Sequence, residues 1–385
     1  MKNRKGFWQG ALVGALAVLL MIGIVSCGVN VGNNAISKKA EEKIQLIEKL
    51  IQKSYAGDVE EELLEEGLIK GYVSGLEDPY STYYTEEETE ELFESVQGEY
   101  VGIGAVLNQD METGVITILQ VYKDSPAMKA GIQGGDILYK VDEKEVTGID
   151  LTEVVKWIKG EENTDVNLTV VRDGKEVETT AVRAEIEIVT VEYEMLEEKI
   201  GYIAVSEFQD ATYEQYKTAL KELENQGMKS LIVDLRNNPG GSLSTVCEMA
   251  DLMLPKGLIV YTEDKNGNRD EHKSDDKNQF TKPLVVMING NSASASEIFS
   301  GAIQDYEIGT ILGTQSFGKG KVQQIFDLKD GTCLKLTISK YYTPNGRDID
   351  GEGITPDIEI EFKEDENNPN ADNQLDQAIR ILKSK

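Results

Sequence analysis

The chain has 385 residues, which predicts about two or three domains rather than one compact core. It carries 69 Asp and Glu residues against 39 Lys and Arg residues, a formal net charge of −30. Such a surface repels phosphate backbones and excludes nucleic acid as a partner. The charged fraction of 28% and the hydrophobic fraction of 40% are otherwise typical of a globular protein.

The N-terminal segment 1–37 differs from the rest of the chain. Lys2, Arg4 and Lys5 precede a run without any charged residue, Gly6 to Ser37. About 20 apolar residues span a bilayer, so this run is long enough to cross a membrane once. The basic residues favour a cytoplasmic N-terminus and an extracytoplasmic body. We therefore expect an uncleaved, single-pass cell-membrane anchor, and a buried core helix is the weaker interpretation.

The same segment contains an alternative to the anchor. Ile24-Val25-Ser26-Cys27 resembles the lipobox of bacterial lipoproteins, in which the cysteine is acylated and the preceding signal peptide is removed. The apolar run is somewhat long for a signal peptide. Lipidation at Cys27 therefore stays the second hypothesis, and both hypotheses tether the protein to the membrane.

The other two cysteines, Cys247 and Cys333, show neither the spacing of a disulfide framework nor that of a metal site. Buried thiols are the favoured interpretation. No cluster of His with Cys or Glu occurs in the sequence, so we expect neither a metal ion nor another cofactor.

Residues 38–96 are expected to form a helical N-terminal region. Apolar residues recur near helical spacing within 38–76, the segment "EDPYSTYY" breaks the pattern, and a second acidic helix is predicted at 85–95. From residue 100 the pattern changes to short strands and glycine turns, with one short amphipathic helix at 151–159. We predict a compact module at 97–183.

The segment 184–363 alternates short apolar strands with helices. Strands are predicted at "KIGYIAVSEF", "SLIVDLR", "PLVVMIN" and "GTILGTQ". This alternation predicts an α/β fold, in which βαβ units build a buried parallel sheet and the module at 97–183 is an insertion. An acidic linker and an amphipathic helix follow within 364–385. The helical segments 38–95 and 371–385 are candidates for a homodimer interface.

The stretch "NGNSASASEIF" follows one of the predicted strands and opens a helix. Ser294 and Glu297 have the spacing of a capping box, in which a hydroxyl and a carboxylate satisfy free backbone amides. The same position lies at the carboxyl end of a parallel sheet, where α/β folds bind ligands. Amides at a helix start can also stabilise a developing oxyanion. Ser294 is therefore either a helix cap or a nucleophile, and a nucleophile needs a base.

Lysine is the candidate base. The chain has a single histidine, His272, and it lies in a polar segment that we interpret as a solvated loop. In "TQSFGKGKVQQIF", Lys319 lies between Gly318 and Gly320, which let the backbone approach its surroundings closely. A lysine base must be neutral, so its pKa must fall from about 10.4 towards roughly 7–8. That fall corresponds to a burial penalty of roughly 4 kcal/mol on the charged form.

Two further motifs have weaker interpretations. The segment 313–319 matches the first seven positions of a phosphate-binding P-loop, but Gly320 replaces the hydroxyl residue that holds magnesium, and the following residues predict a strand. The segment "DLRNNPGG" is typical of a strand-to-helix turn. One of its glycine amides is a candidate oxyanion donor.

Taken together, "NSASASEI", "SFGKGKVQQ", "DLRNNPGG", "DPYSTYY" and "TPNGRDIDGEGITPDI" resemble the carboxyl-terminal processing proteases, also called tail-specific proteases. The resemblance covers nearly everything from residue 38 onward. It implies an exported serine endopeptidase that uses a serine–lysine dyad.

Residue by residue, the resemblance implies a nucleophile at Ser294 and a general base at Lys319. Gln323 matches the glutamine that orients the lysine. The resemblance also implies an oxyanion hole formed by the amide of Ala295 and that of a glycine in "DLRNNPGG". Gly241 is preferred for the second donor, with Gly240 the alternative.

The module at 97–183 resembles a PDZ domain. "VGIGAV" matches its carboxylate-binding loop, which implies peptide binding by Val101, Gly102, Ile103 and Gly104. A substrate tail would add as a strand beside the helix at 151–159. The alternative is a module that only holds a partner or the two copies of a homodimer together.

The expected function is a membrane-tethered, extracytoplasmic serine endopeptidase that binds C-terminal tails of protein or peptide substrates and cleaves through an acyl-enzyme. The main rival is a PDZ scaffold on a degenerate protease fold, and an NTPase is the third hypothesis. The intact set of Ser294, Lys319 and Gln323 argues against the scaffold.

Overall fold

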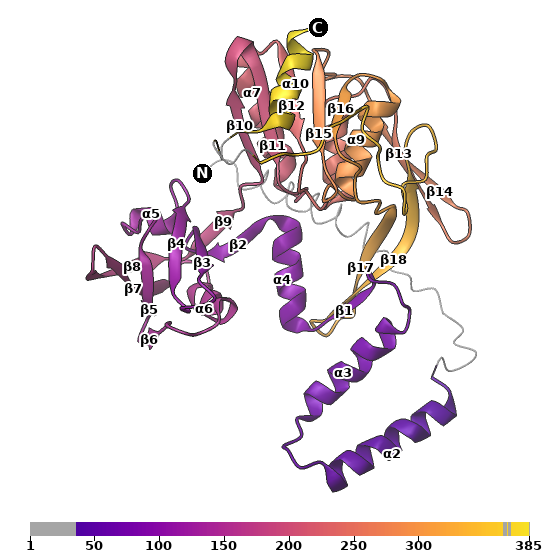
Figure 1. The fold of residues 1–385 in the computed structure, drawn as a ribbon. Helices are drawn as coiled ribbons and strands as arrows, with labels where there is room; N and C mark the ends of the chain where they lie inside the picture. Colours follow the sequence, from indigo (N-terminus) through magenta and orange to yellow (C-terminus); the bar gives the residue numbers. More distant parts are fainter. Residues whose placement is uncertain (1–35, 365–367, 369–370, 385) are drawn as a thin grey trace, which may run out of the picture. The chain divides into compact units, whose positions relative to one another are not determined.

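The computed structural model of the chain describes residues 36–364, 368 and 371–384 (Figure 1). These residues form two compact units, each described here by itself. The smaller unit comprises the described residues up to Thr89 together with Gln323–Thr337, and the larger unit comprises Glu90–Val322 with Ile338–Lys385. The predicted anchor and Cys27 lie outside the described residues. Within the described ranges, no helix has both the length and the apolar composition needed to cross a bilayer.

The smaller unit is mainly helical, which confirms the prediction for 38–76. Helix α2 spans Lys38–Ser54 and α3 spans Glu61–Ser74, and Ser37 caps α2 by accepting a hydrogen bond from the amide of Ala40. The segment predicted only to interrupt the helices also forms a strand, β1. The β elements of this unit and the helix that begins in it are β1 (Thr82–Tyr84), α4 (Glu86–Gln97), most of β17 (Lys321–Asp327) and the first half of β18 (Cys333–Tyr342).

Strand β1 pairs antiparallel with the first residues of β18, with Tyr83 opposite Leu334. Tyr83 and Cys333 are buried there, and the Ser81 hydroxyl accepts a hydrogen bond from the amide of Thr337 at 3.1 Å. Cys333 and Cys247 are both free and buried, as the sequence interpretation expected.

Within the larger unit, the segment 99–187 has its own apolar core. Its main sheet has the strand order β3-β4-β5-β7-β8, with β6 paired to β5, so β3 is an edge strand. The entering strand β2 and the leaving strand β9 form a separate antiparallel pair. The elements are β2 (Glu99–Gly102), β3 (Ala105–Gln109), β4 (Ile116–Val121), α5 (Pro126–Lys129), β5 (Ile137–Val141), β6 (Lys144–Glu145), α6 (Leu151–Ile158), β7 (Asp165–Arg172), β8 (Lys175–Val182) and β9 (Ala184–Glu187).

An ion pair joins the buried Asp136, just before β5, to the partly exposed Arg172 at the end of β7. Arg172 donates to both carboxylate oxygens of Asp136, at 2.7 and 2.6 Å, and to the carbonyl of Gly131 at 2.8 Å. The Arg172 hydrogen bond holds the pKa of Asp136 below its ordinary value, so the pair stays ionised at neutral pH.

The rest of the larger unit is a layered α/β core. Its six-stranded sheet has the order β10-β11-β12-β15-β16-β19. The strands from β11 to β19 are parallel to their neighbours, which confirms the predicted parallel sheet, but β10 is antiparallel to β11 and makes the sheet mixed at that edge. The sheet strands are β10 (Val191–Met195), β11 (Ile200–Val205), β12 (Ser230–Asp234), β15 (Leu284–Ile288), β16 (Thr310–Gly313) and β19 (Ile358–Glu359).

Helices cover both faces of this sheet (Figure 1). Val286 and Ile288 of β15 face the core formed with α7, α8 and α9, whereas Val285 and Met287 face α10. Because successive side chains of a strand point to opposite faces, a strand buried on both faces has a continuous apolar sequence. The helical elements are the short η1 (Glu197–Lys199), α7 (Thr212–Asn225), α8 (Leu243–Asp251), α9 (Ala295–Asp305) and α10 (Asn373–Lys383).

The segment around His272 is not a loop, contrary to the sequence interpretation. It forms β14 (Arg269–Ser274), which pairs antiparallel with β13 (Gly257–Asp264) and sets His272 opposite Val260. The histidine side chain is 33% exposed and lies 3.8 Å from Asp270. The six residues of β14 are all polar and mostly exposed, so the sequence lacks the apolar alternation that indicates a strand.

Candidate active site

Ser294 lies at the junction of β15 and α9, where the predicted capping box is present. Its backbone has a φ of +54°, which is uncommon for a residue with a side chain and marks a locally strained turn. The amide of Ser294 donates to Glu297 Oε2 at 2.8 Å. The carboxylate therefore stabilises a backbone conformation that a serine rarely adopts.

Ser292 and Ser296, on either side of Ser294, connect this turn to the loop at 234–241, called the glycine loop below. Ser292 Oγ donates to the carbonyl of Leu235 at 2.7 Å, and Ser296 Oγ donates to the carbonyl of Asn238 at 3.0 Å. Both serines are fully buried. They position the segment that follows β12, and the sequence interpretation had given them no role.

Glu297 also binds the loop that carries Lys319. Its Oε1 accepts hydrogen bonds from Ser316 Oγ at 2.5 Å and from the amide of Gly318 at 2.7 Å. Its Oε2 accepts from the amide of Lys319 at 2.9 Å, in addition to the amide of Ser294. One carboxylate therefore joins two segments that are 22 residues apart in the chain.

The carboxyl group of Glu297 has no exposed surface. Burial raises its pKa, and the hydrogen bonds from Ser316, Gly318, Ser294 and Lys319 oppose that shift by stabilising the ionised form. A carboxylate is the side chain that suits this place, because its two oxygens can accept all four donors and neither of them must donate.

The glycines beside Lys319 allow the close approach that the sequence predicted. A Cβ atom on Gly320 would lie 2.4 Å from the amide nitrogen of Asp350, and Gly318 has a φ of +89°. The approach is to the loop at 350–353, whose Gly351 amide donates to the carbonyl of Gly318 at 2.8 Å. Lys319 itself is half-buried.

The glycine loop lies directly against the serine turn. A Cβ atom on Gly240 would lie 2.7 Å from the Cβ atom of Ser294, so a larger residue does not fit there. The amide of Gly240 donates to Asn238 Oδ1 at 2.8 Å. Across the described part of the chain, no acceptor is found for the amides of Gly241 and Ala295.

Gln323 lies in β17, in the smaller unit. Its side-chain nitrogen donates to Thr337 Oγ1 at 3.3 Å. The expected role of Gln323, orienting Lys319, stays a prediction.

The predicted peptide-binding loop lies half in strand β2 and half in the irregular segment that follows it. Val101 and Gly102 belong to β2 and pair with Glu185 and Ala184 of β9. Ile103 and Gly104 follow that strand, and for their amides no acceptor is found among the described residues. The last two positions therefore have the free amides that a carboxylate needs.

Comparison with protein families gives three matches along the chain. Residues 199–360 match peptidase family S41, and residues 117–172 match the PDZ domain. Residues 27–89 match the N-terminal domain of the activating protease CtpB.

Curated relatives and a solved structure give further similarities. Proteins named probable CtpA-like serine protease, from Staphylococcus haemolyticus and Staphylococcus epidermidis, are each 40% identical to this chain, over 284 and 286 residues. The alignments cover 73% of this chain but 57% of each relative, so the chain spans little more than half of their length. A solved Bacteroides fragilis structure assigned to the S41 proteases is 17% identical, with a TM-score of 0.52 over 83% of this chain and 90% of that chain. At that identity the likeness shows the fold alone.

The four hydrogen bonds to Glu297 predict a measurable stability effect. Glu297→Gln is expected to lower the free energy of unfolding by about 2 kcal/mol, because the amide nitrogen of Gln cannot accept and leaves buried donors unpaired. Hydrogen exchange should increase at the amides of residues 316–320. The matched control is Glu307→Gln, an exposed residue just beyond α9. Equal unfolding curves for wild type and Glu297→Gln in denaturant would contradict this account of Glu297.

Proposed function

We propose that the protein is a serine endopeptidase of the carboxyl-terminal processing type, because residues 199–360 match peptidase family S41 and residues 117–172 match the PDZ domain. Its proposed organisation is a membrane anchor or lipoprotein signal at 1–37, a helical region at 38–96, a PDZ domain at 97–183, a protease core at 184–363 and an acidic linker with a helix at 364–385. No cofactor takes part in the proposed reaction.

The observation that carries the proposal is the carboxylate of Glu297, which binds both the turn at Ser294 (the serine turn) and the loop at 316–320 (the lysine loop). The amides of Ser294 and Lys319 both donate to Glu297 Oε2, at 2.8 and 2.9 Å. Two backbone segments that bind the same oxygen atom are neighbours in space. This supports a dyad in which the Lys319 amine accepts the proton of the Ser294 hydroxyl.

In the proposed reaction, Ser294 Oγ attacks the scissile carbonyl carbon while its proton moves to Lys319 Nζ. The electron pair of the carbonyl moves to oxygen, and the tetrahedral intermediate then expels the amine. Lys319 returns the proton to the leaving nitrogen, which leaves an acyl-enzyme on Ser294. A water molecule, deprotonated by Lys319, attacks the ester and releases the new C-terminus and the serine hydroxyl.

The amides of Gly241 and Ala295 are the proposed oxyanion donors. They have no acceptor in the described chain, and Ala295 opens helix α9, whose dipole favours negative charge. The amide of Gly240 is the weaker alternative, because it already donates to Asn238. Gln323 is proposed to orient the lysine as in the family that the sequence resembles.

The proposed substrates are proteins or peptides with an exposed C-terminus. Strand β3 is the edge of its sheet, so an extended tail can pair with it on the side of helix α6. The amides of Ile103 and Gly104 would then bind the terminal carboxylate, with Val101 and Gly102 fixing the start of the loop through β2.

The proposed location is the outer face of the cell membrane. The support is the uncharged run from Gly6 to Ser37 after three basic residues, with lipidation at Cys27 as the alternative. Mass spectrometry of the mature N-terminus distinguishes the two, because an acylated Cys27 excludes retention of residues 1–26.

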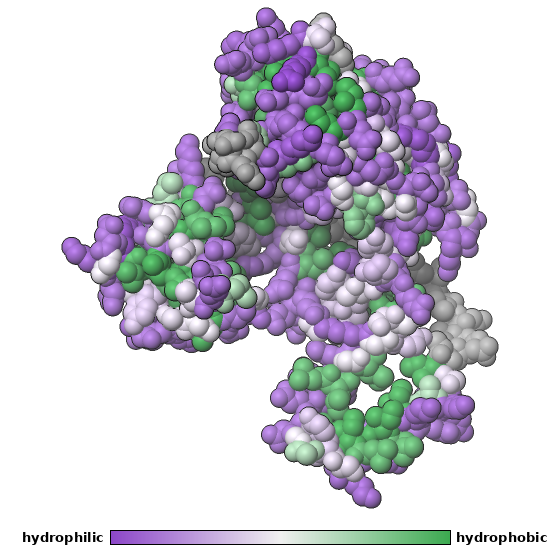
Figure 2. Space-filling model, viewed as in Figure 1, coloured by the Kyte–Doolittle hydropathy of each residue, from purple (hydrophilic) through white to green (hydrophobic). Residues whose placement is uncertain are grey.

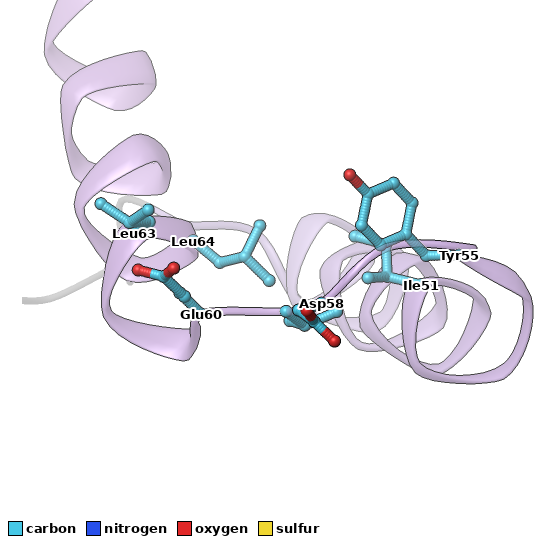
Figure 3. A pocket seen from close by; sticks show the side chains of 7 residues that line it. Ile51, Tyr55, Asp58, Glu60, Leu63 and Leu64 are labelled. Atoms are coloured by element: carbon cyan, nitrogen blue, oxygen red, sulfur yellow. The ribbon is translucent and has the colours of Figure 1, made fainter.

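We further propose that α2 and α3 form a homodimer interface. Helix α2 has no buried residue, and apolar side chains gather over both helices (Figure 2). Side chains of Ile51, Tyr55, Leu63 and Leu64 line an open cavity between the two helices (Figure 3). Exposed apolar surface of this extent marks an interaction site. The C-terminal helix α10 packs Ala378 and Leu382 on the sheet, and its part in the expected interface stays a prediction.

Removal of either dyad residue tests the reaction. Ser294→Ala and Lys319→Ala are each expected to lower kcat/KM on a tailed, unfolded substrate by at least about 10³-fold, since nucleophile and base act as a unit. Lys321→Ala, which changes a lysine two residues away, serves as the control and should cleave normally. If both dyad variants cleave at the wild-type rate, the dyad assignment is wrong.

Capping the substrate tail tests the PDZ proposal. A peptide substrate with an amidated C-terminus is expected to show a kcat/KM at least about 10-fold lower, mainly through KM, because the loop amides lose a charged acceptor. The control peptide keeps its free C-terminus and carries a Glu→Gln change at an internal position, which removes the same charge. Equal kinetics of the amidated and free peptides would exclude recognition of the terminal carboxylate.

Light scattering tests the dimer. The fragment that starts at Ser37 is expected to have twice the monomer mass, and Leu46→Lys with Leu50→Lys should give monomers by placing charges on the apolar surface. The control is Leu119→Lys, an equally exposed leucine in the PDZ segment. A monomeric mass for the unsubstituted fragment would rule out this interface.

A further inference from the structure

Tyr341 lies in β18, outside every segment that has been given a chemical role so far. It is 1% exposed, and its ring belongs to the main apolar core of the larger unit. Its amide donates to the carbonyl of Gly320 at 3.0 Å, so its backbone is already bound to the lysine loop.

The Tyr341 hydroxyl contacts the main chain of both proposed dyad residues. It lies 3.1 Å from the carbonyl oxygen of Ser294 and also within hydrogen-bond distance of the carbonyl oxygen of Lys319. The Ser294 carbonyl already accepts the amides of Glu297 at 2.8 Å and Ile298 at 3.0 Å. Since a phenol has a single hydrogen, that hydrogen is best used by the Lys319 carbonyl.

Tyr341 and Glu297 contact the same two residues at different main-chain groups. Glu297 accepts from the amides of Ser294 and Lys319, whereas Tyr341 contacts their carbonyls. Both side chains are almost completely buried, so water does not compete for these bonds. The Lys319 backbone is therefore held at its amide by Glu297 and at its carbonyl by Tyr341, whereas the Ser294 carbonyl touches the same hydroxyl and accepts the amides of Glu297 and Ile298.

Proton transfer between a hydroxyl and an amine requires heavy-atom separations near hydrogen-bond length. A misplacement of about 1 Å can lower a rate by about 100-fold. Anchors that fix the backbone of both partners to one another therefore act on the rate of the chemical step rather than on substrate binding.

We propose that the Tyr341 hydroxyl is a positioning group for the Ser294–Lys319 dyad. It donates to the main-chain carbonyl of Lys319 and packs against that of Ser294, which sets the separation of nucleophile and base. This inference rests on the proposed serine endopeptidase function. The aromatic ring fills the core, and the positioning belongs to the hydroxyl alone.

The test is Tyr341→Phe, which keeps the ring and removes the hydroxyl. On a tailed substrate, kcat is expected to fall by roughly 10- to 100-fold while KM stays within about twofold. Hydrogen exchange of residues 316–320 should rise while the rest of the core keeps its protection.

The matched control is Tyr342→Phe, at the next position of the same strand. The ring of Tyr342 stacks on Tyr261 at a centroid distance of 4.9 Å. This variant should keep the wild-type kcat and KM.

Three outcomes would overturn the assignment of Tyr341. These are a kcat for Tyr341→Phe within about twofold of wild type, an equal loss in Tyr342→Phe, or a Tyr341→Phe chain that does not fold, which would make the hydroxyl structural. Failure of the proposed function gives a different result, because Ser294→Ala and Lys319→Ala would then keep cleaving the same substrate.

Discussion

The site depends on one buried carboxylate. Glu297 accepts two hydrogen bonds at each oxygen, and its donors come from the serine turn and from the loop around Lys319. A buried charge is tolerated only where it is fully hydrogen-bonded. The need to satisfy Glu297 therefore brings the two loops together, and the energy of those bonds offsets the strained φ of Ser294.

The sheet provides the rigid support for these loops. Its central strands are buried on both faces, by α7, α8 and α9 on one side and by α10 on the other. Ser294 and Lys319 follow β15 and β16, which are parallel neighbours, and the glycine loop follows β12 on the other side of β15. Carboxyl ends of parallel strands meet at one edge, so three loops separated in sequence reach the same region. Ser292 and Ser296 then bind the glycine loop to the serine turn by hydrogen bonds to main-chain carbonyls.

The N-terminal helices follow a different physical logic from the core. In the core, apolar side chains are buried within the chain itself. In α2 and α3, leucine and isoleucine side chains remain exposed, although α2 is capped by Ser37. Forming such helices costs conformational entropy, and the burial of apolar side chains within the described chain offsets little of that cost.

The sequence by itself determined the parallel core, the extent of the helical and strand-rich segments and the identity of the candidate residues. Short apolar runs such as "SLIVD" and "LVVMI", alternating with helical segments, predicted strands buried on both faces, and Gly318 and Gly320 marked a close backbone approach. It missed the strand at His272, because a hairpin with exposed polar residues lacks an apolar alternation. It also assigned Glu297 only to the capping box, since periodicity describes neighbours along one helix.

Only the tertiary structure decided which groups share a partner. The second pair of bonds at Glu297 and the two carbonyl contacts of Tyr341 all join segments that are distant in sequence. The physical reason is that hydrogen-bond satisfaction is a property of buried space. A side chain's spare lone pairs are visible in the sequence, but the donors that fill them are chosen by the packing of the sheet and its loops.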